Sequence, residues 1–159
     1  MTISVGDRIP DTSLVKATAG SPEQVGSAEF FAGRTVALFA VPGAFTPTCS
    51  TRHLPGYVQK AGDLRAKGVD EIACISVNDA FVMGAWANAS KADGITMLAD
   101  GNGDFARAVG LASDSSRFGM GTRSQRYAMI VDDGVVRTLH VEGPGEFKVS
   151  SADHLLSTL

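Results

Sequence analysis

Two uninterrupted apolar runs dominate the pattern of hydrophobic and polar positions along the chain. They lie at residues 33–41 (GRTVALFAV) and 71–77 (EIACISV), and neither shows the alternation of a half-exposed strand. Strands that are covered on both faces have this pattern, so we expect two central strands. Between them, residues 47–67 carry apolar side chains at three- and four-residue steps and end at Gly68, which predicts a helix kinked at Pro55. Strand, helix and strand form a βαβ unit with parallel strands and a right-handed crossover.

The helix and strand patterns continue to alternate after this unit. Residues 80–90 and 103–109 predict helices, and residues 95–99 between them predict a short strand. A last short helix is expected near Ser150, where Ser150 and Asp153 form a weak capping box.

The pattern changes near residue 126, where two apolar runs lie close together. Residues 126–131 and 135–141 flank an Asp-Asp-Gly turn at 132–134. An Asp-Gly turn between apolar runs indicates an antiparallel hairpin. The predicted fold class is therefore α/β, with a central mixed β-sheet and helices on both faces.

Length and composition indicate one domain over residues 1–159. A chain of 159 residues with 44% apolar and 19% charged side chains has enough material for a single core. The net charge is -3 and no run of Lys or Arg occurs, so a nucleic-acid partner is not expected. No stretch approaches the roughly 18 apolar residues of a membrane span. The N-terminal residues do not resemble a secretory signal, and we expect the protein in the cytoplasm.

The cysteine and histidine content argues against several kinds of site. The two cysteines, Cys49 and Cys74, cannot form the disulfide framework of a small secreted domain. Two cysteines and three histidines show no zinc spacing, and the GMG of residues 119–121 lacks the context of a dinucleotide fingerprint. We therefore expect neither a metal nor a cofactor.

The junction VPGAFTPTCS at residues 41–50 carries the strongest chemical signal. With Thr46 as N-cap, Pro47 takes the first helical position and Cys49 falls in the first turn. Free N–H groups and the helix dipole favour a thiolate at such a position, so Cys49 is predicted to be an activated nucleophile. The alternative is a small apolar filler, which is the commoner use of a buried cysteine.

Other uses of this cysteine can be tested by spacing. Arg52 stands where a C-x-x-C motif needs its second cysteine, and Pro55 stands where a phosphatase loop needs its arginine. A cysteine hydrolase remains open, because His53, His140 and His154 are available as bases. By default His53, one turn after the cysteine, is expected on the helix surface, although it could line the pocket.

These residues resemble a known family. Pro42, Thr46 and Cys49 match the P-x-x-x-T-x-x-C motif of peroxiredoxins, and the segments HLPGY and ACISVNDAF are similar to the type II, peroxiredoxin-5-like branch. The resemblance extends over nearly the whole chain. It implies a thioredoxin-like fold and a thiol peroxidase that reduces hydrogen peroxide and organic hydroperoxides.

The resemblance also implies a role for each motif residue. Cys49 would be the peroxidatic nucleophile, Thr46 would hydrogen-bond the peroxide, and Pro42 would shield the site. The fourth family residue is an arginine entering the late hairpin, which is Arg126 in SQRYAMIVDDG. A guanidinium there would stabilise the thiolate and hold the peroxide oxygens. Arg123 lies nearby and is a weaker candidate.

The source of the thiol that regenerates the cysteine is a separate question, since peroxide attack leaves a sulfenic acid. Leu54 occupies the position where some relatives have a resolving cysteine, and GEFKVSSAD near the C-terminus contains none. Cys74 lies in an apolar run and is expected to be buried and inert. An external reductant is therefore expected: glutathione with glutaredoxin by resemblance, with thioredoxin left open.

Two further expectations concern partners and an alternative function. The family implies a homodimer, and apolar side chains flank the proposed site at Phe45, Phe81, Trp86, Phe118 and Met120. The alternative function is a thiol-based redox sensor or relay that is oxidised at the same cysteine without sustained turnover.

Overall fold

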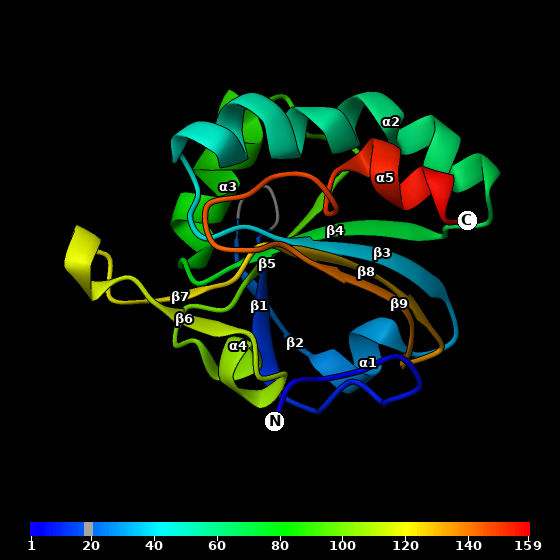
Figure 1. Cartoon of the computed structure of the whole chain (residues 1–159), viewed down its shortest axis with the longest axis horizontal. Helices are drawn as coiled ribbons and strands as arrows, with labels where there is room; N and C mark the ends of the chain where they lie inside the picture. The colour runs from blue at the N-terminus through cyan, green and yellow to red at the C-terminus, as the bar shows by residue number, and fades with distance from the viewer. Residues whose placement is uncertain (18–20) are drawn as a thin grey trace.

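The computed structural model describes residues 1–17 and 21–159, and it places a seven-stranded sheet between two layers of helices (Figure 1). The strand order is β2-β1-β5-β4-β3-β8-β9, and β6 and β7 form a separate ribbon. The elements in chain order are β1 (Ser13–Ala17), β2 (Glu23–Gly26), α1 (Ser27–Phe31), β3 (Thr35–Ala40), the π-helical turn η1 (Cys49–His53), α2 (Leu54–Ala66), β4 (Glu71–Ser76), α3 (Ala80–Ala89), β5 (Thr96–Ala99), α4 (Asp104–Ala108), β6 (Ala112–Asp114), the 3-10 turn η2 (Ser116–Phe118), β7 (Thr122–Ser124), β8 (Tyr127–Asp132), β9 (Val135–Val141) and α5 (Ala152–Ser157).

The two long apolar runs form the adjacent parallel strands β3 and β4 at the centre of the sheet, as predicted. The hairpin β8–β9 is also confirmed, and its turn places Asp133 and Gly134 at φ 47° and φ 80°. Strand β8 runs antiparallel to β3, so the sheet is mixed. The predicted strand β5 and helices α3 and α4 are present with slightly shorter bounds.

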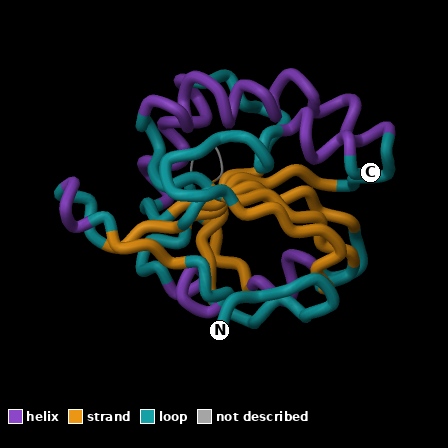
Figure 2. The backbone as a smooth tube through the Cα atoms, in the orientation of Figure 1, coloured by secondary structure: helices purple, strands orange, loops and turns teal. Residues whose placement is uncertain are grey.

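Helices α2, α3 and α5 cover one face of the sheet, and α1 and α4 cover the other (Figures 1 and 2). Side chains along β3 alternate between two cores, with Phe39 in the first and Leu38 in the second. Because both faces are covered, the strand is apolar and buried at every position from Val36 to Ala40. Trp86 lies beside the site through its hydrogen bond to Ser50, but it is buried in the first core and adds nothing to the exposed aromatic surface.

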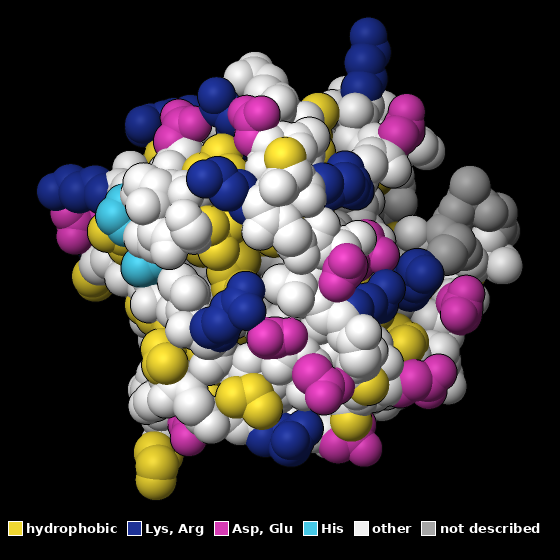
Figure 3. All heavy atoms as spheres, turned by 90° about the vertical axis from the view of Figure 1, so that its right-hand side faces the viewer, with side chains coloured by type: hydrophobic (Ala, Val, Ile, Leu, Met, Phe, Trp, Pro, Cys, Tyr) yellow, Lys and Arg dark blue, Asp and Glu magenta, His cyan; other side chains and the backbone are white. Residues whose placement is uncertain are grey.

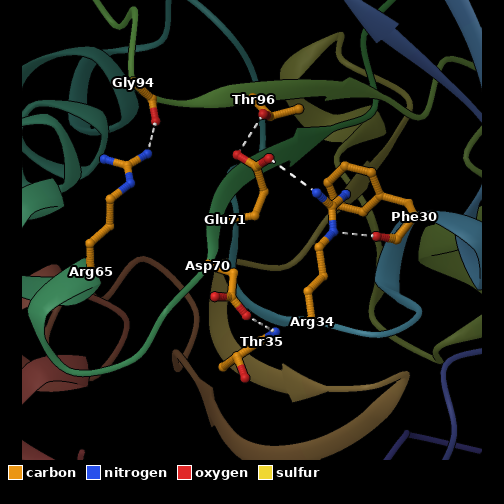
Figure 4. A network of polar contacts seen from close by, with 8 residues as sticks. All are labelled: Phe30, Arg34, Thr35, Arg65, Asp70, Glu71, Gly94 and Thr96. Atoms are coloured by element: carbon orange, nitrogen blue, oxygen red, sulfur yellow. Dashed lines mark hydrogen bonds and ion pairs between the residues drawn. The ribbon is translucent and has the colours of Figure 1, made fainter.

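A network of polar contacts joins the amino-terminal ends of β3, β4 and β5, at the opposite end of β3 from the loop that follows it (Figure 4). The Glu71 carboxylate accepts a hydrogen bond from Thr96 Oγ1 at 2.8 Å and pairs with Arg34 at 3.3 Å. Asp70 accepts from the Thr35 backbone N–H at 2.9 Å. Since Thr35, Glu71 and Thr96 each begin a strand, the network holds β3, β4 and β5 in register and leaves their carboxyl ends for other contacts.

Several elements were not predicted, and one cap was placed wrongly. Strands β1, β2, β6 and β7 have three to five residues and are half-exposed, so they lack a long apolar run.

Helix α5 begins one residue later than expected, because Ser151 Oγ accepts the hydrogen bond from the His154 N–H at 3.1 Å. Ser150 instead faces the interior and is fully buried.

The surface carries charges of both signs. On the face drawn in Figure 3, the described basic and acidic side chains are intermixed rather than gathered by sign. Among the described residues, no helix is both long and apolar enough to cross a membrane.

Candidate active site

Cys49 lies just past the carboxyl end of β3, where the chain turns into a helix. The Ser50 N–H donates to the Thr46 carbonyl at 2.9 Å, so the helical turn begins after Thr46, as predicted. The predicted α-helical geometry was wrong, because residues 49–53 form the π-helix η1 before α2 begins. The Cys49 side chain is fully buried against the apolar core. Its sulfur therefore sits in a site from which bulk water is excluded.

The Thr46 hydroxyl does not cap the helix. It donates to the Gly43 carbonyl at 2.7 Å, inside the loop between β3 and η1. A Cβ atom on Gly43 would lie 3.1 Å from Thr46 Cγ2, so the loop packs tightly at this point. With its proton engaged by Gly43, the Thr46 oxygen has lone pairs free to accept a hydrogen bond. Pro42 is half-buried at the start of this loop, and its shielding role stays a prediction.

Arg126 contacts Cys49, although 77 positions separate the two residues in the sequence. Ala40 at the end of β3 pairs with Tyr127 at the start of β8, which places the residue before β8 beside the loop after β3. Arg126 Nη2 donates to Cys49 Sγ at 3.1 Å. Arg123 is engaged elsewhere, because its guanidinium donates to the carbonyls of Met120 and Val77, each at 2.8 Å. The sequence motif thus selected the arginine that contacts the sulfur.

His53 is a site residue that sequence analysis placed on the helix surface by default. The structure buries it completely, and its Nδ1 lies 2.8 Å from Arg126 Nη1. Its Nε2 lies 3.0 Å from the Ser150 carbonyl, which can only accept, so Nε2 carries the proton and Nδ1 accepts from Arg126. Burial, reinforced by the Arg126 charge, lowers the pKa of His53 to about 3. The ring is therefore neutral. It accepts a hydrogen bond that orients the Arg126 guanidinium, and it does not repel the positive charge of that group.

Glu142 closes the loop that covers His53, and no sequence pattern indicated it. One oxygen of its buried carboxylate accepts from three successive backbone N–H groups, those of Lys148, Val149 and Ser150, at 2.7, 2.9 and 2.8 Å. The same oxygen accepts from Ser150 Oγ at 2.7 Å. Burial opposes ionisation, but these hydrogen bonds hold the pKa of Glu142 below its usual value.

The loop of residues 143–150 connects Glu142 to the sulfur through a chain of hydrogen bonds. The Glu142 N–H donates to the Arg126 carbonyl at 2.9 Å. The Ser150 carbonyl receives both His53 Nε2 and the Tyr57 hydroxyl, the latter at 2.8 Å. Glu142 thereby positions Ser150, Ser150 orients His53, and His53 orients Arg126.

Cys74 lies on β4, beside Phe39 of β3, and is fully buried, as predicted. Burial raises the pKa of its thiol well above the usual value, and a charge on Cys49 would raise it further. A thiol that stays protonated is a poor nucleophile. Among the described residues, no three His, Cys, Asp or Glu side chains gather in a way that could hold a metal ion. The candidate site is built on the contact between the Arg126 guanidinium and the Cys49 sulfur.

We expect His53 to make the protein less stable in acid. The pKa of His53 is about 3 in the folded protein and 6.5 when unfolded, so between these values the unfolded chain binds one more proton. Stability then falls as pH falls, by about 2 kcal/mol between pH 7 and pH 5 from this residue alone. Urea unfolding of wild type and His53→Gln at both pH values measures the difference.

The two proteins share all their other titrating groups, so only the difference between their pH dependences reports on His53. If wild type and His53→Gln lose the same unfolding free energy between pH 7 and pH 5, the assignment of a neutral His53 in the folded protein is contradicted. Should His53→Gln fail to fold, the ring proton resonances of His53 in the wild type provide a second measurement. They should show no titration between pH 7 and pH 5.

Comparison with known proteins gives consistent matches over the whole chain. The protein family described as Redoxin matches residues 4–156. The sequence is 52% identical to Peroxiredoxin-2E-2, chloroplastic, of Oryza sativa subsp. japonica, covering 99% of this chain and 73% of that protein. The crystal structure of reduced Prx3 in complex with hydrogen peroxide from Vibrio vulnificus superimposes with a TM-score of 0.95 at 54% identity, covering 99% of each chain. That of Plasmodium falciparum antioxidant protein, a 1-Cys peroxiredoxin, gives 0.93 at 26% identity, covering 98% of each.

Proposed function

The chain belongs to the peroxiredoxin family, and we propose that Cys49 is the residue that attacks the peroxide and that glutathione restores its thiol. Membership gives the chain a thioredoxin-like fold and a thiol peroxidase activity, as the motif predicted. The observation that supports the choice of Cys49 is the Arg126 guanidinium, whose Nη2 donates to the buried sulfur at 3.1 Å. A fixed positive charge at this distance stabilises negative charge on sulfur.

In the first step the Cys49 sulfur attacks the terminal oxygen of a hydroperoxide. The S–O bond forms as the O–O bond breaks, the sulfur is oxidised to sulfenic acid, and the leaving oxygen takes up the proton that the Cys49 thiol gave up and departs as water or an alcohol. We assign Arg126 to hold the peroxide oxygens and to offset the charge that develops on them. Thr46, whose oxygen is free to accept, would receive the peroxide O–H, and Pro42 would keep water from the sulfur.

In the second step an external thiol reduces the sulfenic acid. The chain contains only two cysteines, and Cys74 is buried in the core on β4, so it is badly placed to act as a resolving thiol. Glutathione would form a mixed disulfide with Cys49 and release water. A second glutathione, or glutaredoxin, would then attack the glutathione sulfur of this mixed disulfide. A new disulfide with glutathione forms, and the Cys49 thiol is released. The similar Plasmodium falciparum protein is described as a 1-Cys peroxiredoxin, which supports this scheme.

A coupled assay tests the choice of reductant. With hydrogen peroxide as substrate, we expect sustained turnover with glutathione and glutaredoxin, and slower turnover with thioredoxin and its reductase. The reverse order would assign thioredoxin as the reductant. A single stoichiometric oxidation with every reductant would instead favour the redox sensor, which the peroxiredoxin matches do not favour.

We also propose a homodimer that works in the cytoplasm. In the described part of the chain three large aromatic side chains are exposed, Phe45 at 55%, Phe81 at 76% and Phe118 at 69%, and a partner subunit would cover such surface. Two free cysteines are typical of a reducing compartment. Sedimentation equilibrium should give twice the 16.5 kDa mass of the chain, and cell fractionation should recover the protein in the soluble cytoplasmic fraction.

A further inference from the structure

A groove of about 290 Å³ opens beside the active site, between the first turns of α2 and α5. Its size is at the lower end of the range for small-molecule sites, roughly 300 Å³ and above. Its lining includes four side chains from different elements: Arg52 of η1, Lys60 of α2, Phe147 of the loop of residues 143–150, and Asp153 of α5. Arg126, which donates the hydrogen bond to the Cys49 sulfur, is not among the residues that line the groove.

The ring of Phe147 is a wall of both the groove and the active site. Its centroid lies 5.0 Å from that of His53, and the Arg126 guanidinium carbon lies 5.8 Å from it. The Arg52 guanidinium carbon, on the groove side, lies 4.8 Å from the same centroid. Arg52 and Cys49 also belong to the same π-helical turn. A small molecule in the groove would therefore lie one aromatic ring from the residues that surround the sulfur.

The charges of the groove suit a ligand with two carboxylates and one ammonium group. Arg52 is exposed to solvent beside Phe147, so its N–H groups can take up a carboxylate. Lys60 Nζ lies 3.7 Å from Asp153 Oδ1, and the two side chains are 40% and 80% exposed. An ion pair this loose and exposed contributes little, so a ligand can separate it at low cost. The groove then offers two cations and one carboxylate.

We propose that this groove binds glutathione during the reduction of the Cys49 sulfenic acid. The inference rests on the proposed function, in which glutathione is the reductant. Arg52 and Lys60 bind the two carboxylates, Asp153 binds the ammonium group, and the thiol points past Phe147 toward Cys49. The glutathione sulfur attacks the Cys49 sulfur, the S–S bond forms as the S–O bond breaks, and the hydroxyl leaves as water with the thiol proton. Sulfenic acid is thereby reduced and glutathione oxidised to the mixed disulfide.

The test uses the full chain and two thiols that differ in charge. In the double variant Arg52→Gln, Lys60→Gln we expect kcat/KM for glutathione to fall by about tenfold or more, the scale of removing one charge-assisted hydrogen bond. Turnover with dithiothreitol, which has no carboxylates, should stay at the wild-type rate. The rate at which hydrogen peroxide oxidises Cys49, followed by stopped-flow fluorescence of Trp86, should also be unchanged. The matched control is Lys67→Gln, which removes an exposed cation just beyond the far end of α2.

Each outcome decides a different point. Equal losses with glutathione and dithiothreitol would mean that the variant damages the site itself, and would overturn the groove. If the double variant keeps the wild-type kcat/KM for glutathione, the groove is not the glutathione site, although glutathione can still be the reductant. A loss seen only when glutaredoxin is present would assign the groove to a protein partner instead. If wild type is not recycled by glutathione at all, the proposed reductant fails, and the groove proposal fails with it.

Discussion

Cys49→Ser is expected to abolish the reduction of hydrogen peroxide, whereas Cys74→Ser should leave it close to the wild-type rate. Both side chains are fully buried, so burial alone does not separate them. The difference is the environment, because Arg126 donates to the Cys49 sulfur at 3.1 Å, while burial holds the pKa of the Cys74 thiol well above its usual value. A serine hydroxyl at position 49 cannot become a sulfenic acid. Peroxide consumption with dithiothreitol as reductant measures both variants.

Dithiothreitol keeps this experiment independent of the biological reductant. Each variant is first checked by circular dichroism and urea unfolding, because either substitution changes a packed core position. Peroxide reduction that survives in a folded Cys49→Ser protein would overturn the assignment of the nucleophile. A folded Cys74→Ser protein that is oxidised normally at Cys49 but fails to turn over would instead show that Cys74 takes part in regeneration.

Arg126→Met should slow the oxidation of Cys49 by hydrogen peroxide by roughly 100- to 1,000-fold, the scale of losing a donor that acts in the transition state. The side chain supplies two N–H groups in a fixed fork, with Nη2 on Cys49 Sγ and Nη1 on His53 Nδ1. Methionine fills a similar volume but removes both donors and the charge. Stopped-flow fluorescence of Trp86, which lies near η1 through its hydrogen bond to Ser50, follows the oxidation.

Two further arginine variants make the experiment specific. Arg126→Lys keeps the charge but loses the fork, so it should retain only part of the rate. Arg123→Met removes the bonds to the Met120 and Val77 carbonyls and should affect oxidation far less, since Arg123 is engaged with those carbonyls rather than the sulfur. If Arg126→Met oxidises at the wild-type rate and Arg123→Met does not, the roles of the two arginines are reversed.

The hydrogen bonds around His53 explain why the guanidinium can serve two partners. A protonated imidazole would repel Arg126, but the pKa of His53, lowered mainly by burial, keeps the ring neutral. The buried Glu142 carboxylate carries a negative charge, and it accepts hydrogen bonds from the backbone N–H and the hydroxyl of Ser150. Ser150 lies between this charge and the His53 ring. The Arg126 charge is therefore not opposed by a second positive charge on His53.

Local sequence patterns were enough to predict the central part of the fold and to single out Cys49 as the candidate nucleophile. Strands β3 and β4 and the hairpin β8–β9 were predictable because burial on both faces and an Asp-Gly turn leave local patterns. Cys49 and Thr46 were predictable because the Thr-Pro-x-Cys sequence places them at the start of a helix. Arg126 was identified only through the family motif, since no local pattern joins it to Cys49.

The positions of His53, Glu142 and Phe147 depend on contacts between segments that lie far apart in the sequence. Helical spacing placed His53 on a surface by default, and the loop of residues 143–150 buries it instead. Glu142 holds that loop through backbone N–H groups, which every non-proline residue has and which therefore leave no sequence signal. The register of β3 against β8 brings Arg126 to Cys49, because pairing between distant strands is set by the packing of the whole sheet.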